Sequence, residues 1–184
     1  MVTIEIKDAK DIHDFLARCN EIESTKFRCH FHLIQEYMQK GYVYKELGSA
    51  YGKSAIFGVL GGAKELHIID INTSQFNAHK HYFEDALGKE KLIIKEISSL
   101  SNDAVYECDC MLIDTVHRKD HLIKELNLHA STVKDWIAIH DTFKLRNTLS
   151  PLGPAVKDWL KINKDWELRE ELKIGAGTML IQRK

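Results

Sequence analysis

Apolar residues recur at helical spacing in the first part of this 184-residue chain. They form two stripes, Ile12, Phe15, Leu16 and Cys19, followed by Phe31, Ile34, Tyr37 and Met38. Gly41 then ends the helical pattern, as glycine commonly does. We therefore predict that residues 1–40 form an N-terminal helical cap.

After Gly41 the pattern changes to short apolar runs separated by segments of helical length. The predicted strands are Tyr42–Leu47, Glu65–Asp70, Lys91–Lys95, Cys110–Asp114 and Trp136–His140. The helices predicted between them are Lys53–Leu60, Gln75–Leu87 and Lys119–Ala130. This alternation predicts an α/β fold with a Rossmann-like, mostly parallel sheet and helices on both faces.

The end of the chain follows a different plan. A last helix is predicted at Gly153–Ile162, and two further strands at Trp166–Leu172 and Thr178–Gln182. Gly175 and Gly177 between these strands indicate a tight turn. The fold should therefore end in an antiparallel hairpin.

Length and composition limit the possible partners. A chain of 184 residues fits one domain, residues 1–184, and a net charge of −1 indicates no attraction to nucleic acid or to an anionic membrane. The sequence has neither a signal-peptide core nor an apolar run of the roughly 18 residues that span a bilayer. We expect a cytoplasmic protein whose oligomeric state the sequence leaves open, a homodimer included. Its cysteines are expected to be reduced thiols: Cys19, Cys29, Cys108 and Cys110.

The first predicted strand runs into a turn that contains Gly48 and Gly52, followed by a helix. Glycine lets the backbone turn sharply and approach a ligand closely. The spacing matches neither the dinucleotide fingerprint nor the P-loop, which favours a ligand without phosphates. Asp70 ends the second strand, where a carboxylate can accept hydrogen bonds from both hydroxyls of a ribose. The alternative is that Asp70 caps the next helix.

Acidic residues also end the fourth and fifth strands. If these strands are neighbours, Asp114, His140 and Asp141 converge and could bind a divalent cation. The carboxylates suit magnesium or manganese, and the imidazole suits zinc or iron. The alternative is that Asp141 caps a turn over His140. His117, in the loop after Asp114, is a candidate general base because the ordinary pKa of histidine lies near neutral pH.

Other polar residues receive no function from the pattern. Lys53 and Lys144 are interpreted as solvent-exposed charges. His121 and His129 are placed on predicted helices and given no functional role. Cys108 and Cys110 are too close in sequence for a typical structural zinc site.

These motifs, in this order, resemble class I S-adenosylmethionine-dependent methyltransferases over residues 40–184. The resemblance rests on Glu46-Leu47-Gly48 with Gly52, Ile68-Ile69-Asp70, Ile113-Asp114-Thr115-Val116-His117, Ile139-His140-Asp141-Thr142, Gly153-Pro154-Ala155-Val156-Lys157-Asp158-Trp159-Leu160, Trp166-Glu167-Leu168 and Gly177. Within that superfamily the chain is similar to the branch of cephalosporin-hydroxylase-like proteins and small sugar O-methyltransferases.

The resemblance implies roles for these residues. Contacts to the cofactor are implied for Glu46, Gly48, Ser49, Gly52 and Asp70, and positions beside the transferred methyl group, often with magnesium, for Asp114 and Asp141. The segment Glu96-Ile97-Ser98-Ser99 departs from the family, because relatives often place there an acid that contacts the adenine amine. Ser98 or Ser99 would substitute for that acid.

The sequence thus predicts an S-adenosylmethionine-dependent methyltransferase that methylates a hydroxyl of a small acceptor. One alternative is a catalytically degenerate cofactor-binding module that serves a protein partner. Another is a nicotinamide or nucleotide enzyme on the same type of sheet, which the glycine spacing disfavours. The N-terminal helices carry no motif that identifies the acceptor.

Overall fold

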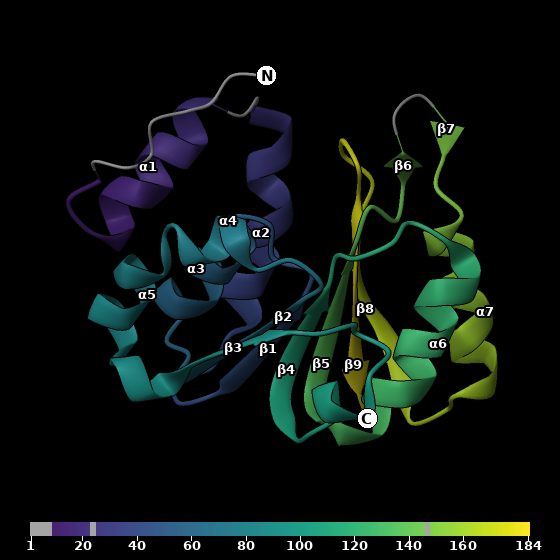
Figure 1. The fold of residues 1–184 in the computed structure, drawn as a ribbon. Helices are drawn as coiled ribbons and strands as arrows, with labels where there is room; N and C mark the ends of the chain where they lie inside the picture. The colour runs from purple at the N-terminus through teal and green to yellow at the C-terminus, as the bar shows by residue number, and fades with distance from the viewer. Residues whose placement is uncertain (1–8, 23–24, 146–147) are drawn as a thin grey trace.

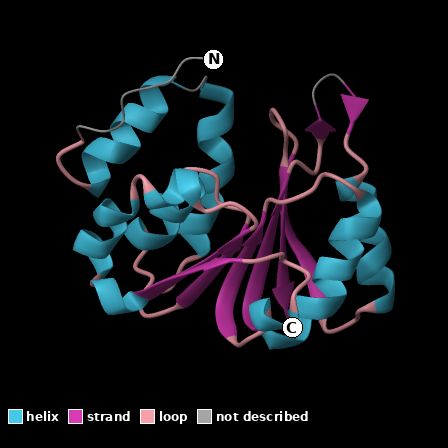
Figure 2. Cartoon of the chain, viewed as in Figure 1, coloured by secondary structure: helices cyan, strands magenta, loops and turns pink. Residues whose placement is uncertain are grey.

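The computed structural model describes residues 9–22, 25–145 and 148–184. Its centre is a seven-stranded sheet in the order β3-β2-β1-β4-β5-β9-β8, with helices on both sides (Figures 1 and 2). The parallel strands are β1 (Val43–Leu47), β2 (Glu65–Asp70), β3 (Leu92–Glu96), β4 (Cys108–Ile113) and β5 (Val133–His140). The antiparallel pair β8 (Trp166–Leu172) and β9 (Thr178–Arg183) completes the sheet beside β5. The predicted fold class is confirmed.

Each face of the sheet is covered by its own group of helices (Figure 1). One group comprises α1 (Ile12–Ile22), α2 (Thr25–Tyr37), α3 (Lys53–Leu60), α4 (Ser74–Asn77) and α5 (Lys80–Leu87), and the other comprises α6 (Lys119–His129) and α7 (Leu152–Ile162). Alternate residues of the strands serve the two faces: in β5, Trp136 and Ala138 pack in the first core, and Ile137 and Ile139 in the second. Burial on both faces explains the apolar runs Met111–Ile113 in β4 and Trp136–Ile139 in β5.

Several predicted boundaries were wrong. The single helix predicted at Gln75–Leu87 is the two helices α4 and α5. β4 and β5 begin before their predicted starts, because polar residues near their amino ends have partners. Asp109 Oδ2 accepts the N–H of Val43 at 2.7 Å, and Asp135 Oδ2 accepts the hydroxyl of Tyr42 at 2.7 Å. The ribbon of β6 (Lys144–Leu145) and β7 (Thr148–Leu149) was not predicted, since two residues carry no periodicity.

Two predictions from composition can be compared with the structure. Cys108 and Cys110 are buried free thiols, as predicted, and Cys19 is buried as well, whereas the side chain of Cys29 lies outside the described part. Among the described helices, none has the length and apolar character needed to cross a membrane.

Candidate functional site

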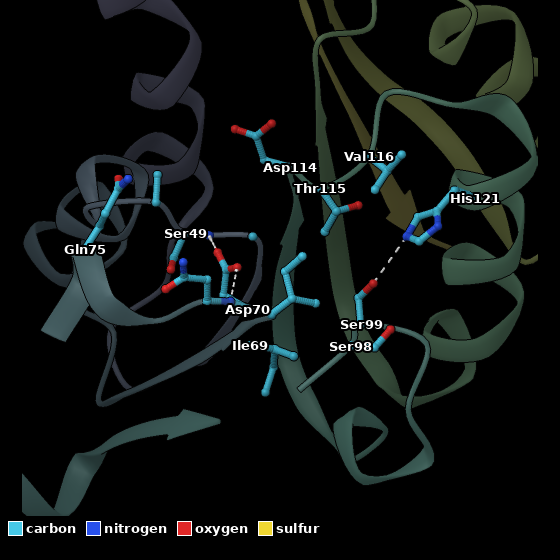
Figure 3. Close-up of a pocket in the computed structure, with 14 residues that line it drawn as sticks. Ser49, Ile69, Asp70, Gln75, Ser98, Ser99, Asp114, Thr115, Val116 and His121 are labelled. Atoms are coloured by element: carbon cyan, nitrogen blue, oxygen red, sulfur yellow. Dashed lines mark hydrogen bonds between the residues drawn. The ribbon is translucent and has the colours of Figure 1, made fainter. Parts of the chain in front are cut away.

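The carboxyl ends of β1, β2 and β4 open onto a cavity of about 370 Å³ (Figure 3). Its walls are the turn after β1, the end of β2, and the loops after β3 and β4. Six of the predicted site residues line it: Gly48, Ser49, Asp70, Ser98, Ser99 and Asp114. The parallel sheet thus brings together residues that the sequence separates widely.

The turn after β1 passes very close to the end of β4. Gly48 has a φ of 81°, and a Cβ atom added to it would lie 2.1 Å from the carbonyl oxygen of Asp114. Ala50, in the same turn, has a φ of 46°, which is uncommon for a residue with a side chain. Such backbone strain concentrates at ligand-binding sites.

Asp70 connects this turn to the end of β2. Its Oδ2 accepts the N–H of Ser49 at 2.8 Å and its Oδ1 accepts the N–H of Asn72 at 3.0 Å. The N-cap position of α4 belongs to Thr73, so Asp70 is not the helix cap of the alternative interpretation. A carboxylate oxygen accepts more than one hydrogen bond, which leaves both oxygens able to accept from a ligand in the cavity.

The acid that ends β3, Glu96, is bonded to the start of α4 and does not face the cavity. Glu96 Oε2 accepts the N–H of Thr73 at 3.0 Å and its hydroxyl at 2.8 Å, and these bonds lower the pKa of Glu96. Glu96 therefore holds the start of α4 and does not line the cavity.

Asp114, His117, His140 and Asp141 form one cluster beside the cavity. His117 Nε2 lies 2.7 Å from Asp141 Oδ2 and 3.6 Å from Asp114 Oδ1. His140 Nδ1 lies 3.3 Å from Asp114 Oδ2 and 3.5 Å from Asp141 Oδ1. β4 and β5 are neighbours, so the convergence expected of these residues is present.

The cluster changes the protonation of its members. Hydrogen bonds to Asp114 and Asp141 raise the pKa of His117 to about 10. Burial raises the pKa of Asp114, but hydrogen bonds from His117 and His140 lower it to about 2. The choice of His117 as a general base assumed an ordinary pKa. In this arrangement His117 is an imidazolium that donates to the carboxylates.

The same cluster offers a possible metal site. Ligand atoms of Asp114, His140 and Asp141 lie within 4.8 Å of one another, and two carboxylates with an imidazole suit manganese or zinc. His117, however, already supplies a positive charge between the two acids. A cation would therefore have to displace His117 from Asp141 Oδ2.

Glu46 and Gly52 lie behind the cavity and do not line it. The carboxyl group of Glu46 is completely buried and is hydrogen-bonded to the hydroxyls of Tyr44 and Ser54. Burial raises the pKa of Glu46 to about 8, although both hydrogen bonds oppose the shift. A Cβ atom on Gly52 would meet the ring of Phe76 at 2.8 Å. Both residues thus support the turn from below.

A second cavity, of about 210 Å³, lies beside the first and shares the backbone of residues 48–50 and Asp114 with it. Phe31 of α2 and His140 also line it, and their rings stack with centroids 5.1 Å apart. Lys53 lines it too and is only 4% exposed, so its assignment to solvent was wrong. Lys144, by contrast, is exposed as predicted.

Three residues of α6 were missed by the sequence analysis. His121 lines the first cavity, while Glu125 and His129 are completely buried behind it. Their spacing of four residues places them on one helix face. This polar stripe on a helix that packs against the sheet was the available signal.

Solved structures share this fold at low sequence identity. A ribosomal protein L11 methylase from Lactobacillus delbrueckii matches with a TM-score of 0.67 and 16% identity, over 89% of this chain and 81% of that one. A tRNA methyltransferase from B. subtilis gives 0.61 and 15%, over 84% of this chain and 64% of that one. A Streptococcus mutans protein in complex with S-adenosylhomocysteine gives 0.63 and 8%, over 89% and 100%.

The chain therefore has the fold of class I S-adenosylmethionine-dependent methyltransferases. No protein-family model and no curated protein sequence matches it. The structural neighbours do not test whether the chain belongs to the cephalosporin-hydroxylase-like branch, so that assignment stays a prediction.

Proposed function

We propose that this protein transfers the methyl group of S-adenosylmethionine. The observation that carries the proposal is the cavity in which Asp70 is joined to the turn after β1 by the hydrogen bond from the N–H of Ser49. This arrangement offers acceptors to a ribose and a closely approaching backbone to the adjoining part of the ligand. The S-adenosylhomocysteine in a structural neighbour supports the same ligand here.

The walls of the cavity suit the adenine ring as well. Ile71 and Val116 both line it and are 76% and 45% exposed, so two large apolar side chains are available to a flat apolar ligand. A planar base placed between them would cover both. In this orientation the ribose meets Asp70, and the methionine part lies along residues 48–50 toward Asp114.

For the acceptor we propose a small hydroxylated molecule in the second cavity. Its volume of about 210 Å³ suits a small molecule, and it meets the cofactor cavity at Asp114. The acceptor oxygen would form its bond to the methyl carbon as the carbon–sulfur bond breaks, which leaves S-adenosylhomocysteine. The hydroxyl proton would pass to solvent water. The protein's main contribution to such a displacement is alignment and exclusion of water.

An RNA acceptor is the competing possibility, because a structural neighbour is a tRNA methyltransferase. The net charge of −1 gives no general attraction to phosphates. Transfer of labelled methyl groups to a panel of small phenols and hydroxy acids, compared with transfer to total RNA, separates the two classes. Labelling of RNA alone would overturn the small-molecule acceptor.

The first prediction concerns cofactor binding. S-adenosylhomocysteine should raise the melting temperature of the wild type. Asp70→Ala should weaken the binding of this ligand about tenfold to a hundredfold, because it removes charge-assisted hydrogen bonds worth roughly 1.5–3 kcal/mol. Calorimetric titration measures the affinity. Glu96→Ala is a matched control. Glu96 is the register partner of Asp70 on the neighbouring strand, but its carboxylate accepts the N–H of Thr73 at the start of α4 and does not line the cavity.

Two results would count against this proposal. Equal loss of affinity in Asp70→Ala and Glu96→Ala would mean that Asp70 acts only through the fold. A wild type that binds NAD but neither S-adenosylmethionine nor S-adenosylhomocysteine would overturn the methyltransferase proposal itself.

A divalent cation fits the donor set of Asp114, His140 and Asp141, where it would polarise the acceptor hydroxyl. In chelator-treated protein, Asp141→Asn should abolish manganese binding. His117→Asn should strengthen it by about tenfold, because the metal no longer displaces the hydrogen bond at 2.7 Å. Calorimetry with manganese measures both. No saturable heat in the wild type or in His117→Asn would leave the cluster as a salt-bridge network.

A further inference from the structure

Glu125 is a buried carboxylate at the centre of a hydrogen-bond network behind the cofactor cavity. Its side chain is completely buried in α6. Oε1 accepts the hydroxyl of Ser99 at 2.6 Å and the hydroxyl of Thr115 at 2.7 Å, and lies 3.2 Å from His121 Nε2. Glu125 thus connects the loop after β3, the loop after β4 and α6.

All three of these partners line the cavity (Figure 3). A hydroxyl has one hydrogen to donate and two lone pairs. Because Ser99 and Thr115 both donate their hydrogen to Glu125, only lone pairs remain for a ligand. At these two hydroxyls the wall of the cavity therefore presents hydrogen-bond acceptors. Ser99 Oγ also lies 3.4 Å from His121 Nε2, and its second lone pair stays available to a ligand.

A second residue of α6 fixes the backbone of the same loop. His129 Nε2 lies 2.7 Å from the carbonyl oxygen of Ser99, and burial lowers the pKa of His129 to about 4. The Nδ1 of His129 lies 3.4 Å from the ammonium of Lys45, which can only donate, so the neutral ring carries its hydrogen on Nε2. Ser99 is therefore held by its side chain and by its carbonyl group, and its lone pairs have a fixed direction.

We propose that Glu125 is a positioning residue for base recognition: it orients the hydroxyls of Ser99 and Thr115 to accept the exocyclic amine of adenine. The inference rests on the proposed binding of S-adenosylmethionine. The nearby acid Glu96 is engaged with Thr73 and does not line the cavity, so it does not serve the amine. The carboxyl group of Glu125 stands one layer behind the hydroxyls that contact the base.

The test compares S-adenosylhomocysteine with its 6-deamino analogue, in which hydrogen replaces the amine. Calorimetry should give a preference of the wild type for the amine of about tenfold to a hundredfold, because the analogue leaves the acceptors unpaired. Ser99→Ala should reduce the preference to below about threefold. Glu125→Gln should reduce it several-fold, because an amide can also donate and no longer fixes the hydroxyl hydrogens.

The matched control is Glu107→Gln, the same chemical change at a side chain that is 78% exposed and pairs with Lys134. It should keep the full preference. A residue that only stabilised the fold would change the two affinities by the same factor and leave their ratio intact. If Glu125→Gln does not fold, as judged by its thermal melt, Glu125→Asp takes its place: the shorter side chain withdraws the acceptor from both hydroxyls and should reduce the preference several-fold, and an unchanged preference would overturn the role of Glu125. Ser99→Ala and Thr115→Val test recognition by the hydroxyls themselves.

The outcomes separate this inference from the proposed function. Equal affinity of the wild type for the two ligands overturns base recognition by these hydroxyls while cofactor binding stands. A preference that falls in Ser99→Ala but not in a folded Glu125→Gln overturns the role of Glu125. Failure of the wild type to bind S-adenosylhomocysteine removes the proposed function and this inference together.

Discussion

Gly48→Ala is expected to abolish detectable binding of S-adenosylhomocysteine and to lower the free energy of unfolding by about 2–5 kcal/mol. Two effects add at this position. The φ of 81° costs an L-residue about 1–2 kcal/mol, and the Cβ atom at 2.1 Å from the carbonyl oxygen of Asp114 forces the turn away from β4. That shift moves the backbone that lines both cavities.

Gly41→Ala separates the two effects. Gly41 has a similar φ of 93°, but no atom of the described residues lies within 4 Å of an added Cβ atom. This variant should lose only about 1–2 kcal/mol of stability and bind the ligand as the wild type does. Urea unfolding and calorimetric titration measure both quantities. Wild-type affinity in Gly48→Ala would show that the turn tolerates a side chain and that its close approach to β4 does not shape the site.

The sequence was sufficient to place residues at strand ends but not to place the strands beside one another. Asp70, Asp114 and Asp141 each follow a mostly apolar run, which can be recognised without a structure, and Gly48 marks the end of the strand before it by its glycine turn. The order of the strands is a property of the whole sheet. It was the pairing of β4 with β5 that brought Asp114 and Asp141 into one cluster.

The protonation states in the cluster of Asp114, His117, His140 and Asp141 could not be predicted from the sequence for the same reason. His117 appeared as an ordinary loop histidine, but two carboxylates from different strands surround it and raise its pKa. Lys53 appeared as a solvated lysine until the packing of neighbouring elements buried it. Glu125 could have been found, because its spacing from His121 and His129 marks a polar stripe on a helix face that should be apolar.

Glu46→Gln is expected to stabilise the protein at neutral and alkaline pH. The completely buried carboxyl has its pKa raised to about 8 by burial, against an ordinary value of 4.5, and the negative charges of Asp114 and Asp70 add to the shift. The folded state therefore holds a proton that the unfolded state releases. The stability of the wild type is fully present below pH 4.5 and falls as the pH rises through about 8.

The size of the effect follows from about 1.4 kcal/mol for each pH unit between the two values. At pH 7 Glu46→Gln should exceed the wild type by roughly 3 kcal/mol, and the two should be nearly equal at pH 4.5. Urea unfolding at pH 4.5, 7 and 8.5 measures the difference, with the exposed Glu107→Gln as the control for loss of a charge. A constant difference across this range would mean that Glu46 has the same pKa in the folded and unfolded chain. The buried carboxylate under the cofactor turn would then be ionised, and its two hydroxyl partners would compensate fully for its burial.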